Sequence, residues 1–154
     1  MADRADGAGA LTYDPVADAA HRYPDWLVAT ADLGGLVPEV LCRVRRVILI
    51  DLEQSPEAQR SSLAHAVAHL DLGHAQTLSP FFETREEIQA DRLAARRLIP
   101  LDAFAEAVSW SRDRTSVASE LGVDLSMLRV REESLSRAER RRLGTRLRAA
   151  PSYH

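Results

Sequence analysis

The sequence lacks several features that would assign a protein to a particular class. All 20 of its basic residues are arginine and none is lysine, which we attribute, with the abundance of alanine, to a GC-rich genome. Cys42 is the only cysteine, so an intrachain disulfide and a cysteine-based zinc cluster are excluded. The longest apolar run, Val47 to Ile50, is far too short to span a membrane. Residues 1–10 lack the basic and apolar regions of a signal peptide. We therefore expect a cytoplasmic protein with no membrane partner.

The residues that are present fit one folded domain. A chain of 154 residues, 45% of them hydrophobic and 28% charged, is long enough for one core and short for two. Segments rich in β-branched residues come first, and segments with helical periodicity follow. We expect an α+β fold with a small N-terminal antiparallel sheet followed by a helical half. The expected boundaries are a disordered N-terminus at 1–12, a domain at 13–136 and an arginine-rich tail at 137–154.

Local signals predict the elements of this fold. Capping residues followed by proline or acids mark helix starts, and glycine or proline marks helix ends. One strand is expected at 26–30, and two short strands or one bent strand at 40–50. The expected helices are 15–22, capped by Asp14; 55–73; 84–99, starting in a capping box at Thr84; 101–111; 116–121; and 126–135.

Two histidines and two acids form a candidate metal site. His65 and His69 are four residues apart in an expected helix, so their imidazoles stack one turn apart and can ligate one metal ion. The next expected helix offers Glu87 as a third ligand. Asp91, one turn later, can accept the free ring N–H of a ligating histidine and fix its tautomer. A hydrolytic zinc requires three such protein ligands and one open position.

Simpler explanations exist for each part of this pattern. Histidine pairs at this spacing also occur by chance in alanine-rich helices, and Glu87 could close the capping box that Thr84 begins. The pattern as a whole, on two helices joined by a short connection, favours metal binding over capping.

Two segments together resemble the ImmA/IrrE family of metallopeptidases. They are His65-Ala66-Val67-Ala68-His69-Leu70-Asp71-Leu72-Gly73-His74, and Glu87-Ile88-Gln89-Ala90-Asp91 continuing to Leu98-Ile99-Pro100. The resemblance covers about residues 12–135. It implies a zincin-like domain with one zinc per chain, held by His65, His69 and Glu87, with Asp91 orienting a histidine. It also implies an intracellular protein substrate or partner, such as a transcriptional repressor, and some members of the family are phage proteins.

Ala66 departs from the family pattern at the position of its general base. The family has a glutamate directly after the first histidine, and alanine cannot transfer a proton in its place. Losing a positioned general base typically costs about 10²–10⁴ in rate. Three explanations stay open: a natural pseudoprotease that binds or sequesters a regulator, replacement of the base by another carboxylate, or an engineered substitution. The candidate replacements are Glu86, Glu83 and Asp71, the last about 240° around the helix from His65.

The other histidines are in less specific positions. His74 lies five residues after His69, beyond the glycine that ends the expected helix, whereas the metzincin pattern has six. We expect it to cap the helix end or line the cleft. His21 and His154 are expected on the surface.

The C-terminal third raises the question of DNA binding. Residues 116–130 resemble a helix-turn-helix, and the arginines that follow extend the candidate DNA-binding surface to 116–148. The second expected helix nevertheless has no evident base-reading face. In the ImmA/IrrE family the matching segment belongs to the peptidase domain, so nucleic acid is not among the expected partners.

Overall fold

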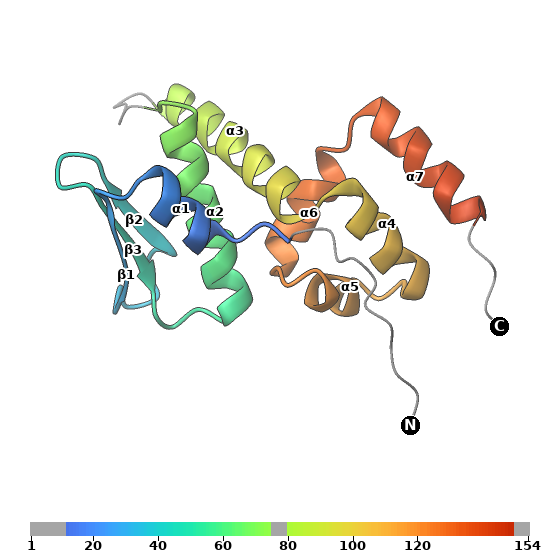
Figure 1. The fold of residues 1–154 in the computed structure, drawn as a ribbon, viewed down its shortest axis with the longest axis horizontal. Helices are drawn as coiled ribbons and strands as arrows, with labels where there is room; N and C mark the ends of the chain where they lie inside the picture. The colour runs from blue at the N-terminus through green and yellow to red at the C-terminus, as the bar shows by residue number, and fades with distance from the viewer. Residues whose placement is uncertain (1–11, 75–79, 150–154) are drawn as a thin grey trace.

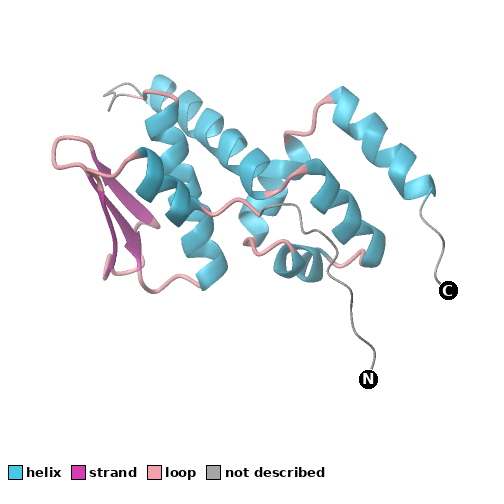
Figure 2. Ribbon diagram, viewed as in Figure 1, coloured by secondary structure: helices cyan, strands magenta, loops and turns pink. Residues whose placement is uncertain are grey.

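The chain folds into a small sheet followed by a series of helices, which confirms the expected α+β class (Figure 1, Figure 2). The computed structural model describes residues 12–74 and 80–149, so the expected disorder at 1–12 and the position of His154 lie outside the described residues, apart from Thr12. None of the described helices is long and apolar enough to cross a membrane. The elements are α1 (Pro15–Arg22), β1 (Leu27–Ala31), β2 (Glu39–Cys42), β3 (Val47–Asp51), α2 (Pro56–Asp71), α3 (Pro80–Leu98), α4 (Leu101–Trp110), α5 (Arg114–Glu120), α6 (Leu125–Glu133) and α7 (Arg137–Ala149).

The sheet is mixed, so the expectation of antiparallel pairing throughout is wrong for its first strand. The strand order is β1-β3-β2. β2 and β3 form an antiparallel hairpin, whose turn ends at Arg46 with a φ of 52°. β1 pairs in parallel with β3. The segment 40–50 therefore holds two strands, one of the two alternatives that the sequence left open.

A buried aspartate holds the connection that makes the sheet mixed. The chain leaves β1 and crosses the end of β3 to begin β2. Asp51, 2% exposed at the end of β3, accepts the backbone N–H groups of Leu33 at 3.2 Å and Gly35 at 3.1 Å. Gly34 and Gly35 both have a positive φ, which side chains other than glycine rarely adopt. This loop leaves the outer edge of β2 open beside the helices.

Helix α2 is shared by two hydrophobic cores. Leu63, Ala66, Val67 and Leu70 pack with β3 and α1 in the sheet core. The opposite side of α2 belongs to a helical core in which alanines meet alanines, and this second core includes Ala64, Ala68, Ala90, Ala94 and Ala95. The small side chains allow α2 and α3 to approach closely. These alanines therefore have a structural role in helix packing, so genome composition alone does not explain the abundance of alanine.

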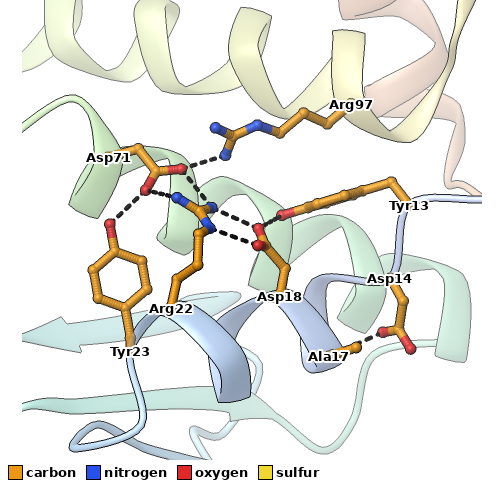
Figure 3. A network of polar contacts seen from close by, with 8 residues as sticks. All are labelled: Tyr13, Asp14, Ala17, Asp18, Arg22, Tyr23, Asp71 and Arg97. Atoms are coloured by element: carbon orange, nitrogen blue, oxygen red, sulfur yellow. Dashed lines mark hydrogen bonds and ion pairs between the residues drawn. The ribbon is translucent and has the colours of Figure 1, made fainter.

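A network of ion pairs ties α1 to α2 and α3 (Figure 3). Arg22 on α1 contacts Asp18 at 2.6 Å and Asp71 at 2.5 Å, and Arg97 on α3 contacts Asp71 at 2.5 Å. The Tyr23 hydroxyl also donates to Asp71. All three helices thus meet at one carboxylate near the end of α2.

Helix α3 begins earlier than the sequence predicts. It starts at Pro80, so Thr84 lies inside the helix and the expected capping box is wrong. Proline is favoured in the first turn of a helix, which explains why the helix begins there. Glu87 therefore lies mid-helix and its side chain is not needed for capping. The other helix boundaries agree with the sequence within a few residues, and Gly73 follows α2 with a φ of 66°.

The last three helices complete the helical core. Asp113 and Asp124 cap α5 and α6 by accepting the backbone N–H groups of Ser116 and Met127. Met127 and Leu128 on α6 are buried in the helical core, which includes residues of α3. Helix α7 lies beside α4 with its arginine-rich surface exposed (Figure 1).

Candidate metal centre

The four residues singled out by their spacing face one another between α2 and α3. His65 and His69 project from α2, and Glu87 and Asp91 from α3, next to the buried alanines of both helices. Because the alanines bring the helices close together, side chains of this length can meet without a further element. His65 is 8% exposed, so the centre lies at the floor of a cleft.

The distances between the side chains define a compact set of donor atoms. The Nε2 atoms of His65 and His69 are 3.0 Å apart. Glu87 places one carboxylate oxygen 3.1 Å from Nε2 of His65 and the other 3.0 Å from Nε2 of His69. His65, His69 and Glu87 therefore lie close enough to bind one metal ion. Ligands bound at about 2.0–2.1 Å around a tetrahedral zinc are separated by roughly 3.3 Å, so little movement is needed.

The outer contacts of the histidines place one ring proton on each Nδ1, and Nε2 of both rings lies next to Glu87. Nδ1 of His65 lies 2.8 Å from Asp91, a carboxylate that can only accept a hydrogen bond when ionised, so this nitrogen carries the proton. Nδ1 of His69 lies 2.9 Å from Nδ1 of His74, and Nε2 of His74 lies 3.0 Å from the side-chain oxygen of Gln89. These contacts are satisfied together when His74 donates to Gln89 and His69 donates to His74.

This pattern of protons fits a bound cation. Two ring nitrogens and a carboxylate converge on one point, and each imidazole that carries its only proton on Nδ1 presents an acceptor there. Lone pairs at this separation repel one another unless a positive charge lies between them. Two imidazoles and one carboxylate are also a common ligand set of hydrolytic zinc. The donor chemistry of the described residues therefore fits the metal that the sequence pattern implies.

The pKa values of the site reflect the same surroundings. Burial lowers the pKa of His65, but its hydrogen bonds to Asp91 and Glu87 outweigh this effect and raise it to about 10. Burial and the neighbouring His65 lower the pKa of His69. Contact with His65 lowers the pKa of Glu87, so this carboxylate is ionised at neutral pH. Without a metal ion, Nε2 of His65 therefore holds a proton at neutral pH beside the ionised Glu87, and a bound cation would take the place of this proton.

A cavity of about 230 Å³ opens onto the candidate metal centre from one side. Ala66 lies on its wall and is 1% exposed. Glu83 and Glu86 also line the cavity, as the sequence suggested for a replacement base, and so does His74. Asp71 does not line it, because its carboxylate is held by Arg22 and Arg97 in the network that joins α1, α2 and α3 (Figure 3).

Glu39 is a residue of this site that the sequence prediction missed. It begins β2, and its Oε1 lies 3.7 Å from Nε2 of His65. Burial raises the pKa of Glu39. It is not among the described groups that lie within 4.8 Å of one another and could hold the ion directly. The sequence does contain one indication of its position. Alternate residues of a strand point to the same side, and Glu39, Leu41 and Arg43 all line the same cavity.

Helix α6 lies on the other side of the centre. A second cavity, of about 330 Å³, is lined by Asp124, Ser126 and Met127 together with His65 and Glu87. The segment that resembles a helix-turn-helix therefore packs against α3 and helps to form the cleft. His21 is exposed on α1, as expected.

Comparison with protein-family models gives a match over most of the chain. The family model Peptidase_M78, described as the IrrE N-terminal-like domain, matches residues 17–132. This range contains the sheet, the candidate metal centre and most of α6, and it stops before α7. No curated protein sequence matches the chain.

Proposed function

The chain belongs to the IrrE N-terminal-like peptidase family, and on this premise we propose that it binds one zinc ion and recognises a regulatory protein in the cytoplasm. We further propose that hydrolysis of this protein is impaired by Ala66. The ligands would be His65, His69 and Glu87, and the regulator would be of the transcriptional repressor type.

The observation that carries the metal assignment is the convergence of acceptors. The Nε2 atoms of His65 and His69 lie within 3.1 Å of the Glu87 carboxylate and of each other. A bound zinc would supply a Lewis acid that polarises a peptide carbonyl. Asp91 and His74 hold the two ligand imidazoles in the tautomers that zinc requires.

The observation that carries the loss of activity is the side chain at position 66. Ala66 lines the cavity together with His65, and its methyl group cannot accept or return a proton. Glu39, Glu83 and Glu86 line the same cavity, and Glu39 lies nearest to a ligand nitrogen among the contacts described. These carboxylates could support slow hydrolysis. Detectable slow cleavage would distinguish an impaired enzyme from an inert one.

Metal analysis of protein purified without chelator tests the ligand assignment. We expect about one zinc per chain, and we expect His65→Ala and His69→Ala to lose it. His21→Ala provides the matched control, because this histidine is exposed on α1 away from the cleft, and its zinc content should not change. Wild-type protein without bound metal at neutral pH would refute the assignment.

Restoring a carboxylate at position 66 tests the cause of the impairment. Ala66→Glu should raise the rate of cleavage of a candidate repressor by about 10²–10⁴, the usual contribution of a general base. Ala66→Gln is the matched control, because glutamine has nearly the same size and no basic group. Equal rates for the two variants would show that the side chain at 66 is not the missing base.

The second candidate function is binding without cleavage, which Ala66 itself favours. In this case Ala66→Glu would still cut nothing, while the wild-type chain would bind its regulator tightly. The same pair of variants therefore separates an impaired peptidase from a pseudoprotease that sequesters a regulator.

A further inference from the structure

We propose that the second cavity, on the α6 side of the candidate metal centre, is a substrate subsite that takes an arginine side chain. This proposal deepens the proposed function and rests on it, because it assigns a sequence preference to the peptide that the cleft would bind. The cavity measures about 330 Å³ and shares Glu39, His65 and Glu87 with the first cavity. The two cavities therefore flank the metal ligands on either side, as neighbouring subsites along one peptide would.

The wall of this subsite carries acids and no basic residue except His65. Glu39, Glu87, Asp91 and Asp124 all line it, and no arginine does. The metal site itself uses Glu87, and Asp91 accepts from His65. Asp124 is left to face a substrate. Glu39 lines the same wall, and its Oε1 also lies 3.7 Å from Nε2 of His65. Asp124 accepts the Met127 N–H with one oxygen, at 3.3 Å, and the described residues make no hydrogen bond to its other oxygen.

A buried hydroxyl on the same wall points independently to a ligand. Ser61 is 4% exposed, and its Oγ has no hydrogen-bond partner among the described residues. Leaving a buried polar atom without a partner is unfavourable, so such atoms are usually satisfied by a ligand or water. Ser61 lies on the cavity wall next to Ser62, whose hydroxyl donates to Gln54. The subsite therefore offers a hydroxyl oxygen and an amide oxygen beside its carboxylates.

These groups match the chemistry of a guanidinium. Arginine carries five N–H donors and no acceptor, and the wall consists mainly of acceptors. Charge-assisted hydrogen bonds to carboxylates are about twice as strong as neutral ones. Met127 and Val130 supply an apolar surface against which the methylene stem of arginine can pack. A lysine would satisfy fewer of the acceptors, because it has three donors on one atom.

Binding of matched peptides to the full chain, after incubation with zinc, tests the proposal. The probes are alanine pentapeptides with blocked ends in which arginine, lysine or citrulline occupies each position in turn. Citrulline has the shape of arginine without its charge. At one position we expect the arginine peptide to bind at least about 10-fold more tightly than the citrulline peptide, with lysine between them. Equal affinities at every position, or no binding of any peptide, would overturn the proposal.

Substitution of Asp124 and Glu39 tests whether the preference for arginine arises in this cavity. Asp124→Asn keeps a side chain that can cap α6 and removes its charge, so it should weaken the arginine peptide about 10-fold and leave the citrulline peptide unchanged. Asp113→Asn is the matched control, because Asp113 caps α5 in the same way and does not line the cavity. Glu39→Gln should act in the same direction as Asp124→Asn. A preference for arginine that survives both substitutions would place it elsewhere and refute the subsite.

The zinc content of the same samples separates this proposal from the proposed function. Protein that binds zinc without preferring arginine would refute the subsite alone. Protein that prefers arginine through Asp124 but binds no zinc would refute the metal assignment and leave the subsite standing.

Discussion

The reactive nitrogens of His65 and His69 depend on what their other nitrogens contact. Asp91 fixes the tautomer of His65 directly. His69 is fixed by a chain of two residues, His74 and then Gln89, which ends at the same helix that carries Asp91. Both arrangements leave Nε2 next to Glu87, where it can ligate a metal ion. Such contacts behind metal ligands commonly change metal affinity by 10–100-fold.

Asp91→Asn tests this support at the scale of one residue. The amide oxygen can still accept from His65, but without the charge that favours the ligating tautomer. We expect zinc affinity to fall by about 10–100-fold, measured by competition with a chelator of known affinity. Asp102→Asn is the control, since Asp102 pairs with Arg146 on the surface and should leave the affinity unchanged. An unchanged affinity in Asp91→Asn would mean that Asp91 does not orient His65.

The ligand residues could be predicted from the sequence because their relations are local. His65 and His69 are one helical turn apart, and so are Glu87 and Asp91, and helical spacing survives folding. The unfavourable position of Asp71 as a replacement base also followed from helix geometry, since it projects to another side of α2. Glu39 was missed because it reaches the site from a strand, and strand order follows from tertiary packing that a local pattern does not contain.

At the scale of the element, α7 is attached by its first turn. Ser136 and Glu139 form a capping box, in which the Ser136 N–H donates to Glu139 at 2.8 Å and the Glu139 N–H donates to the Ser136 hydroxyl at 3.2 Å. Glu139 also contacts Arg131 at 2.7 Å. Arg131 is 2% exposed and donates to the backbone oxygen of Ile99, at the end of α3. One carboxylate thus joins α7 to α6 and, through Arg131, to α3.

Glu139→Gln tests this junction. Glutamine can still complete the capping box, so the change mainly leaves the buried Arg131 without its counter-charge. We expect a loss of about 2 kcal/mol in the free energy of unfolding, between the values typical of exposed and of buried ion pairs. Denaturant unfolding measures it. Glu133→Gln, which removes an exposed pair with Arg129, is the control and should cause no measurable change.

Helices were easier to predict than the sheet for a physical reason. Caps such as Asp14, Ser55 and Asp124 act within one turn, so the sequence around them specifies the helix start. The start of α3 was missed because Thr84 also fits a cap, although Pro80 is equally typical of a first helical turn. The parallel pairing of β1 depends on a loop held by Asp51. The two hydrogen bonds that hold it join Asp51 to residues 18 and 16 positions earlier in the chain. Alternating side chains indicate a strand but not its neighbour.

At the scale of the whole molecule, the two sides of α2 have separate tasks. One side carries His65 and His69, and the other carries Asp71, to which Arg22, Arg97 and Tyr23 all bind (Figure 3). The sheet core and the helical core meet along this helix. The ion-pair network therefore holds α1 and α3 in place around the helix that presents the ligands, so its loss should loosen the cleft as well as the fold.

This arrangement predicts that stability falls in acid. The hydrogen bonds from Arg22 hold the pKa of Asp18 at about 2, below the usual value near 4. Despite the opposing effect of burial, Arg22, Tyr23 and Arg97 together lower the pKa of Asp71. A carboxylate with a lowered pKa stabilises the fold fully above its unfolded pKa, and this contribution is lost as the pH falls towards its folded pKa. The melting temperature of the metal-free protein should therefore drop between pH 5 and pH 2.

Asp71→Asn should show how much of this drop belongs to the network. The variant should melt at a lower temperature than the wild type at pH 5, because Arg22 and Arg97 lose their shared counter-charge. The difference should shrink as the pH falls towards the lowered pKa of the wild-type Asp71 carboxylate and the wild type also loses this charge. Asp25→Asn, which removes an exposed pair with Arg46, should follow the wild-type curve at every pH. A constant difference between Asp71→Asn and the wild type would mean that packing, rather than the charge at position 71, joins α1 and α3 to α2.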